Sequence, residues 1–369
     1  MTEFLHVTLS LIPAFVIIYF LPELSQHDTA FGVKVPKTYQ NDSIIKKEKT
    51  VYRKWNLIWA IGLSGLLWFP FQLENEALMG LILVLLIFLY LGLSTWTFYQ
   101  SYKRIKVWKA NSDWKEQKSE VVVVDTTSRK DFPKSSMLWF ILHGFVTFIT
   151  IIISISLYKE LPNQIPIHFN AQGEADNYVS KTWLSVLSLP FIQVLFIILF
   201  AWLHRVIYKA KLKMNPEQPE LSKLQGQIFR KKWGTFFIFS SLGLTILFLF
   251  IQLSILNIWD SSWIFPSSMI YTFLVLAWVM ILSFKYGQSG SRYMKEEMDA
   301  HSKVIHRDDD QFWIMGQFYF NKEDPSLIVE KRVGVGWTVN LGRPMGWVLL
   351  VGPLVVLFGI IIFDLLGVI

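Results

Sequence analysis

The sequence predicts an all-α membrane protein of about eight transmembrane helices with a small antiparallel β-containing cytoplasmic cap. Hydrophobic residues make up 53% of the 369 positions, whereas charged residues make up 17%. The apolar residues fall in uninterrupted blocks, and several blocks reach the roughly 20 residues that a helix needs to cross a bilayer core. Lys and Arg collect in alternate connections between these blocks, which is the charge bias typical of multi-pass membrane proteins.

Eight apolar runs are therefore predicted to span the membrane. In chain order they cover residues 4–20, 55–71, 77–99, 137–158, 183–207, 233–258, 263–286 and 345–366. The first run has no basic segment before it and no small-residue cleavage site after it, so we expect a retained helix and not a signal peptide. Tryptophans near the run ends are expected to lie at the membrane interfaces.

The charges of the connections predict the topology. The first, third, fifth and seventh connections are basic, and the others are short and acidic or neutral. The positive-inside bias then places the basic connections in the cytoplasm and both termini outside the cell. The same bias explains the net charge of +7, so the lipid bilayer is the expected partner and nucleic acid is not. The absence of cysteine excludes disulfides, thiol nucleophiles and Cys-ligated metals, and no cofactor is expected.

This topology divides the chain into five regions. They are residues 1–136, with three helices and basic cytoplasmic loops; 137–207, a helix-loop-helix module; 208–286, helices six and seven with the basic loop before them; 287–345, a cytoplasmic helix and a β-meander; and 346–369, the last transmembrane helix.

The cytoplasmic connections carry the β-rich segments. Residues 318–321, 327–332 and 337–340 are rich in branched and aromatic side chains and are separated by Asp-Pro and Gly turns, which predicts a small antiparallel meander. A surface helix is expected over 291–305, and residues 121–124 and 31–35 are expected to join the sheet. The candidate site residues of this cap are Asn321, Asp324, Pro325, Glu330, Lys331, Arg332, Trp337, Asn340 and Arg343.

The charges of the cap allow two interpretations. Lys331, Arg332 and Arg343, together with the glycines around them, have the chemistry to cradle an anion or a lipid headgroup. Alternatively, the arginines mark the membrane boundary and the glycines turn the meander. The run of three aspartates at 308–310 lacks the spacing of a calcium loop, so a solvated acidic run is favoured over a metal site.

The external connection over residues 165–182 is the best candidate site. Its candidate recognition residues are His168, Asn170, Gly173, Asp176, Tyr178 and Lys181. His168, Glu174 and Asp176 have metal-binding chemistry, but no second histidine lies nearby, so no metal is expected. The favoured interpretation is a set of tight turns with an interfacial cap on the next helix. A recognition surface for an external peptide is the third interpretation.

Polar residues inside the predicted spans are few. His143 and Gln193 are the interior ones, and a packing role for His143 is favoured over a proton relay. A proton-coupled transporter usually places a carboxylate at mid-depth, and none is clearly placed there. The sequence also lacks a nucleophile elbow, a P-loop and an HExxH motif, which makes an intramembrane enzyme the third choice.

The same external connection resembles the signature of the SdpI-like membrane proteins over about residues 137–203. The residues that carry the resemblance are Leu161, Pro162, Ile165, Pro166, Ile167, His168, Phe169, Asn170, Gly173, Asp176, Asn177, Tyr178, Ser180 and Lys181. Residues 310–344 are similar to a second uncharacterised module of such proteins. Residues 31–36 resemble a Gly-x-Arg-x-Pro element that the family carries late in its chains, here early and with Lys34 in place of Arg.

This resemblance implies a bacterial plasma-membrane protein that gives immunity to, or senses, an external antimicrobial peptide. The expected partners are then an external peptide toxin and a cytoplasmic regulator. A transporter or an accessory subunit of a membrane complex is the alternative.

Overall fold

The computed structural model describes residues 2–26, 28–36, 39–73, 75–112, 119–121, 136–170, 172–210, 218–293, 304–306 and 308–365. The chain forms two compact units. The first comprises Met1–Asp131, Ala210–Phe229 and Leu282–Ile369, and the second comprises Phe132–Lys209 and Arg230–Ile281. Two long helices, α6 (Pro219–Ile255) and α7 (Ile264–Tyr286), contribute residues to both units.

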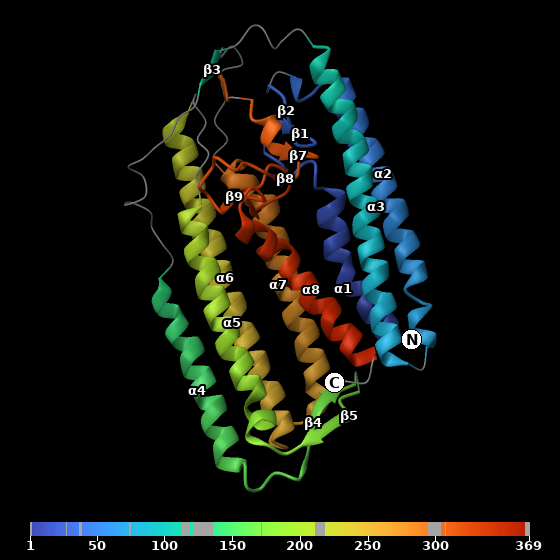
Figure 1. Ribbon diagram of the computed structural model, residues 1–369, viewed down its shortest axis with the longest axis vertical. Coiled ribbons are helices and arrows are strands. Elements are labelled where there is room, and N and C mark those ends of the chain that lie inside the picture. Colours follow the sequence, from blue (N-terminus) through green and yellow to red (C-terminus); the bar gives the residue numbers. More distant parts are fainter. Residues whose placement is uncertain are drawn as a thin grey trace. The chain divides into compact units, whose positions relative to one another are not determined.

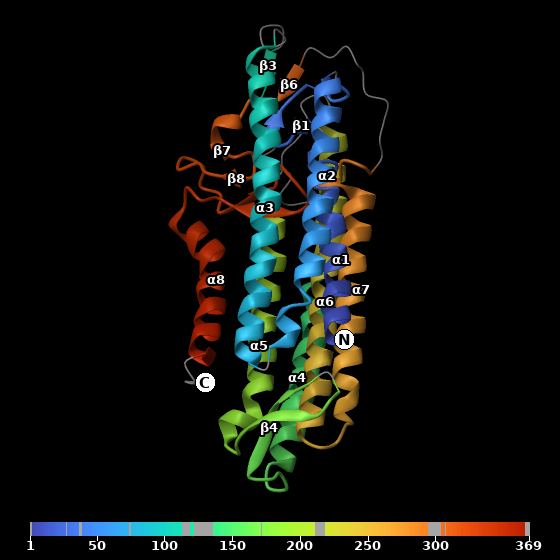
Figure 2. The same ribbon diagram turned by 90° about the vertical axis from the view of Figure 1, so that its right-hand side faces the viewer.

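In the first unit, four helices form the framework: α1 (Thr2–Tyr19), α2 (Ser43–Leu66), α3 (Glu76–Ala110) and α8 (Pro344–Leu365). α1 contacts α2, α2 contacts α3, and α8 lies beside α3, as Figure 2 shows. The rings of Phe88 and Phe358 join α3 to α8, with their centroids 5.5 Å apart.

Helices extend beyond the apolar runs. α3 has 35 residues, so at 1.5 Å per residue it is about 52 Å long. That length exceeds a bilayer core of about 30 Å, and the extra turns carry Lys103, Arg104, Lys106 and Lys109. α2 begins at Ser43, where the Asp42 side chain accepts a hydrogen bond from the Ile44 backbone N–H. The expectation that the basic residues lie in loops is thus wrong for much of the first and third connections.

Five helices of the described chain are long and apolar enough to cross a membrane. They lie within Leu78–Ala110, Met137–Leu157, Trp183–Lys209, Pro219–Ile255 and Ser261–Gly290. Val7–Tyr19 and Pro344–Gly359 are shorter apolar helices, and α2 falls in neither group. Helices dominate and the sheets are small, as expected for an all-α membrane protein. Eight spans are not confirmed: residues 55–66 of the predicted second span lie in α2, which is not among the five long apolar helices.

The strands of the first unit pair in twos. The antiparallel pairs are β1 (Thr29–Ala30) with β2 (Val33–Lys34), β7 (Trp313–Ile314) with β8 (Phe318–Tyr319), and β9 (Ile328–Glu330) with β10 (Trp337–Val339). β3 (Ser119–Val121) and β6 (Val304–His306) pair in parallel. Two of the three strands of the predicted meander, β9 and β10, therefore pair as expected. The third, β8, pairs with β7 instead and reaches the other pair only through an isolated bridge between Tyr319 and Asn340.

Two further expectations need correction or lie outside the described residues. Val304 and Ile305 belong to a strand and not to the helix predicted over 291–305, and 294–303 lie outside the described residues. Val121 does pair as a strand, whereas 122–124 also lie outside them.

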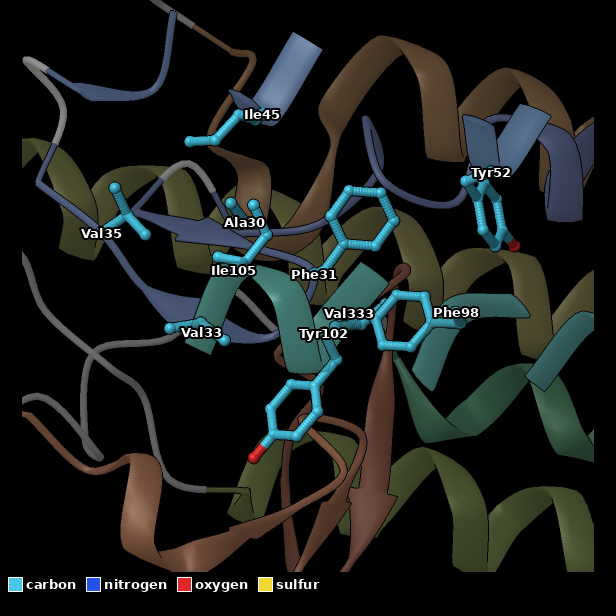
Figure 3. Close-up of a cluster of buried hydrophobic side chains, with 10 residues drawn as sticks. All are labelled: Ala30, Phe31, Val33, Val35, Ile45, Tyr52, Phe98, Tyr102, Ile105 and Val333. Atoms are coloured by element: carbon cyan, nitrogen blue, oxygen red, sulfur yellow. The ribbon is translucent and has the colours of Figure 1, made fainter. Parts of the chain in front are cut away.

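A buried cluster fixes the β1–β2 hairpin to α2 and α3 (Figure 3). Its members are Ala30, Phe31, Val33 and Val35 of the hairpin region, Ile45 and Tyr52 of α2, Phe98, Tyr102 and Ile105 of α3, and Val333. The turn needs glycine at Gly32, where φ is +77° and a Cβ would lie 2.3 Å from the Gly316 carbonyl oxygen. Residues 31–35 therefore pack on the β7–β8 turn as a separate hairpin instead of joining its sheet.

The second unit contains α4 (Phe140–Leu157), α5 (Trp183–Lys209) and most of α6 and α7. Between α4 and α5 lies an antiparallel hairpin of β4 (Gln164–Phe169) and β5 (Ala175–Ser180), visible at the ends of these helices in Figure 1. Short 3₁₀ turns precede α4 at Met137–Trp139 and α7 at Ser261–Trp263.

Candidate functional sites

The external connection singled out in the sequence folds as the β4–β5 hairpin. Gln164 pairs with Ser180, and the register shifts at a bulge around His168, which lies opposite Asn177. Ile165 is 1% exposed and packs in a cluster with side chains of α5 and α6. This buried side chain holds the first strand on the helices.

The tip of the hairpin is built by Asn170 and Gly173. The Asn170 Oδ1 accepts hydrogen bonds from the backbone N–H groups of Gln172 at 3.0 Å and Glu174 at 2.9 Å. Gly173 has φ +82°, and a Cβ there would lie 2.5 Å from the Ser262 Cα. The Ser261 hydroxyl donates to the Gly173 carbonyl at 2.6 Å. The tip is thus closed by its own turn and fastened to the α6–α7 connection.

The base of the hairpin is held by Lys181. Its ammonium group donates to the Leu161 carbonyl at 2.5 Å and lies 5.5 Å from the centroid of the Tyr158 ring. The Tyr158 and Trp183 rings stack with their centroids 3.7 Å apart. Lys181 therefore satisfies backbone at the junction of α4, the hairpin and α5.

The outward face of the hairpin carries His168, Asp176 and Tyr178. The His168 Nδ1 lies 2.6 Å from the Asp176 Oδ1, and the His168 side chain is 59% exposed. Tyr178 and Ile167 are also exposed, at 52% and 47%. Because Asp176 occupies Nδ1, the Nε2 atom of His168 is the ring nitrogen left to meet a ligand. An exposed pair of this kind contributes little to stability. Stability alone therefore does not account for the His168–Asp176 pair.

A metal site does not form here. Glu174, the third residue with metal-binding chemistry, accepts the Asn170 side-chain amide at 3.1 Å instead of facing His168. Across the described residues, no group of three His, Asp or Glu side chains is placed to hold a metal ion.

In the first unit, Asn340 organises residues 308–343, hereafter the cap segment. Its side chain is fully buried, and its Nδ2 donates to the carbonyls of Asn321, Asp324 and Ser326 at 2.8–3.2 Å. Its Oδ1 accepts from the backbone N–H groups of Asn321 at 3.0 Å and Gly342 at 2.9 Å. One amide thus ties three turns of the segment together.

Other candidate residues of the cap segment also hold its backbone. The Asp324 carboxylate accepts from the Tyr319 hydroxyl at 3.0 Å and from the Ser326 N–H at 2.9 Å. Arg343 donates from Nε to the Asp324 carbonyl at 2.9 Å. Burial raises the pKa of the Tyr319 hydroxyl to about 12. The side chains of Asp324 and Arg343 therefore stabilise the backbone of the turn over residues 319–326.

Three further candidates lie around the β9–β10 pair. The buried Glu330 carboxylate accepts from the Ser289 hydroxyl at 2.7 Å. The Trp337 ring lies 5.2 Å from the Phe229 ring, centroid to centroid. Pro325 is exposed on the neighbouring turn. Of these three residues, only Pro325 is exposed.

The three aspartates at 308–310 are partly buried and form an ion-pair network with two buried basic side chains, instead of a fully solvated run. The Arg332 guanidinium is 1% exposed, pairs with Asp309 and with Asp310 at 2.5 Å, and lies 5.0 Å from the Trp313 ring centroid. Lys109 of α3 pairs with Asp308 at 2.7 Å and Asp310 at 2.6 Å. We call this set, with Asp308–Asp310, Lys109 and Arg332, the charge cluster. No local sequence pattern predicts this cluster, since Lys109 and Arg332 lie far apart in the chain.

The charge cluster sets the pKa of Asp308. Burial raises the pKa of this carboxyl, but the hydrogen bond and charge of Lys109, with the Asp310 N–H and Arg332, hold it below its usual value. The structure does not favour the anion site considered from the sequence, because the Arg332 guanidinium already pairs with the carboxylates of Asp309 and Asp310. Gly342 also leaves no room for an anion on its Cβ side, because a Cβ built there would lie 2.5 Å from the Asn321 backbone. The partly buried Lys331 remains, and its burial lowers the pKa of the ammonium group.

The two interior polar residues singled out in the sequence are both fully buried in the second unit. The His143 Nε2 lies 2.8 Å from the Ser241 hydroxyl and Nδ1 lies 3.2 Å from the Trp139 carbonyl. The Gln193 side-chain amide donates to the Thr245 carbonyl at 2.9 Å. The geometry of His143 agrees with a packing role, in which both ring nitrogens have neighbours.

Two of these regions match models of known protein families. A family model described as a domain of unknown function (DUF1648) matches residues 145–194, which include the whole β4–β5 hairpin. A second model, described as a family of unknown function (DUF5808), matches residues 322–347, which include the C-terminal part of the cap segment with Asn340. No curated protein and no solved structure matches the chain.

Proposed function

We propose that this chain is a multi-pass protein of the bacterial plasma membrane that binds an external antimicrobial peptide through the β4–β5 hairpin, in immunity or sensing. The observation that carries the proposal is the hairpin itself. It is held at its base by Lys181 and at its tip by Gly173, while His168, Asp176 and Tyr178 face outward. A rigid scaffold with an exposed polar and aromatic face is the usual setting of a recognition site.

The strand geometry supports an extended peptide as the ligand. β4 and β5 form a sheet of two strands, so within the described chain neither outer edge has a further strand partner. Exposed edges present backbone donors and acceptors to an incoming strand, while alternate side chains give specificity. The exposed Tyr178 and Ile167 supply apolar contact beside the His168–Asp176 pair.

We further propose that the hairpin lies outside the cell and the cap segment in the cytoplasm, where the cap would contact a regulator. The charges of the connections support this orientation, since the basic turns of α2 and α3 lie on the cap side of the first unit. The exposed Lys322, Glu323 and Pro325 are the groups of the DUF5808-like region that a partner would meet first.

The test is tolerance to antimicrobial peptides in the native host. A deletion strain is complemented with the wild-type chain, with the double variant His168→Ala and Asp176→Ala, or with the matched control Glu160→Ala, an exposed residue just before the hairpin. We expect the deletion to sensitise cells to at least one peptide of a secreted or synthetic cationic panel. The control should restore tolerance and the double variant should not, at equal membrane levels. Full restoration by the double variant would exclude the hairpin as the recognition site.

A transporter is the second candidate, because buried polar side chains line the contacts of α4, α5 and α6. Polar groups inside spans commonly mark substrate or proton paths. Purified chain in liposomes that contain a pH-sensitive dye tests this role. Proton uptake that His143→Phe abolishes would favour transport over recognition, and an unchanged internal pH would leave recognition as the function.

A further inference from the structure

The helix bundle of the second unit contains a buried polar seam, whose residues lie on α4, α5 and α6. On α4 the buried polar side chains are His143, Thr147, Thr150 and Ser154, each at most 3% exposed. Their spacing of three or four residues puts them on one face of the helix. We infer that this seam holds an internal water molecule between Thr147 and Gln193, a binding site that the proposed function does not require.

The hydrogen bonds fix the register of α4 against α6. His143 meets Ser241, and Ser154 meets Gln252 at 3.0 Å; both pairs are separated by 98 positions in the chain. A constant positive offset means that the two helices run parallel in this contact. The same offset places Thr147 level with Thr245.

Gln193 of α5 lies at that same level. Its amide nitrogen donates to the Thr245 carbonyl at 2.9 Å. The Thr147 hydroxyl on α4 and the Gln193 carboxamide on α5 therefore both lie at the height of Thr245 on α6, in the interior of the bundle.

Each of these two side chains has a buried oxygen whose hydrogen-bonding capacity is unused among the described residues. Within the described residues, the Thr147 Oγ1 and the Gln193 Oε1 are buried and have no hydrogen-bond partner. This is unusual for Thr147, because neighbouring hydroxyls bond to the carbonyl four residues earlier in their own helix. Thr150 bonds to Val146, Ser154 to Thr150, and Thr245 to Ser241, all at 2.7–2.9 Å.

The donor and acceptor requirements select water as the ligand. Gln193 Oε1 only accepts hydrogen bonds, and Thr147 Oγ1 both donates and accepts. A water molecule donates to the first oxygen and exchanges a bond with the second, and internal waters typically have two to four such partners. A metal ion is a poorer match, since calcium for example takes 6–8 oxygen ligands and this level offers two neutral ones.

A double-mutant cycle on the full chain in detergent micelles tests the water site. Thr147→Val removes the hydroxyl at nearly constant volume, and Gln193→Leu removes the carboxamide. If one water bridges both groups, losing either partner weakens the bond of the water to the other partner. The change in the unfolding equilibrium constant of the double variant will then differ from the product of the two single-variant changes by about threefold or more. The control cycle pairs Thr147→Val with Ser156→Ala, a hydroxyl on the exposed face of α4, and should show simple multiplication.

Multiplicative effects in the Thr147–Gln193 cycle would overturn the inference. A high-resolution density map of the wild-type chain gives a second test that does not depend on the variants folding. We expect one density peak within hydrogen-bond distance of both oxygens. A Thr147 hydroxyl that instead bonds to the His143 carbonyl, or directly to Gln193, would refute the water site.

Discussion

Replacing Arg332 with Met should loosen the cap segment more than any substitution on its surface. The guanidinium is 1% exposed and donates to two carboxylates and to the Gly32 carbonyl, at 2.7 Å for the last. It therefore joins the β1–β2 hairpin to the cap segment. Met fills a similar volume against Trp313 but removes every one of these bonds.

The magnitude follows from what the variant leaves behind. Removing one partner of a buried ion pair costs about 3–5 kcal/mol, because the other charge stays buried. Asp309 and Asp310 are 30% and 17% exposed and can regain water, and Asp310 keeps Lys109. The cost should thus be near the lower value, about 3 kcal/mol. At 1.4 kcal/mol per tenfold, local opening becomes about a hundredfold more frequent.

Hydrogen exchange followed by mass spectrometry measures that opening. Peptides over 28–36 and 308–340 should exchange about a hundredfold faster in Arg332→Met, since local opening limits exchange there. Lys322→Met is the control, because Lys322 is exposed on the same segment and its ammonium lies over the Phe320 ring. Equal exchange in the two variants would show that the charge cluster does not hold the cap segment to the hairpin.

Three further predictions follow from the described contacts. The depressed pKa of Asp308 means that its contribution to stability is present above the unfolded pKa of about 4 and is lost as the pH falls through the lower folded value. Acid-induced opening of the cap, measured by hydrogen exchange, should therefore lose part of its pH dependence in Lys109→Met. Gly173→Ala should detach the hairpin tip, because φ is +82° and the added Cβ meets backbone; faster exchange limited to 164–180 would show it, and unchanged exchange would contradict it. The chain has no cysteine, so single cysteines at Asn177 and Lys322 should react with an impermeant maleimide from outside and only after permeabilisation, respectively; the reverse pattern would invert the proposed topology.

The apolar runs predicted the helices but not their lengths. Residues 77–99 are uninterrupted and apolar, whereas the final turns of α3 mix lysines with aromatic and branched side chains. Yet Tyr102, Ile105 and Lys109 are buried and spaced three or four residues apart, which is a helical period. In α2 the buried Ile45, Glu48 and Tyr52 repeat in the same way. This helical period indicates that both helices extend beyond their apolar runs.

The charge cluster could not be predicted from sequence in the same way. Arg332 meets aspartates more than 20 residues away, and Lys109 meets Asp310 across 201 positions. No local propensity connects such residues, because the folded chain alone brings them together. Three adjacent aspartates are therefore ambiguous, since a solvated run and a paired network have the same local sequence. The buried Arg332 decides between them in this chain.

The hairpin shows which part of a candidate site local sequence can identify. Asn and Gly at the tip predicted a turn, and the turn formed. No local sequence pattern predicted the contact between Gly173 and the α6–α7 connection.

The structure then separates the six candidate residues into two groups. Asn170, Gly173 and Lys181 hold the hairpin, while His168, Asp176 and Tyr178 face outward. Substitution in the first group should disturb the hairpin itself, as faster hydrogen exchange would show. Substitution in the second should leave exchange unchanged and affect recognition alone. If His168→Ala loosened the hairpin as much as Gly173→Ala, the outward face would be structural and the case for recognition there would fail.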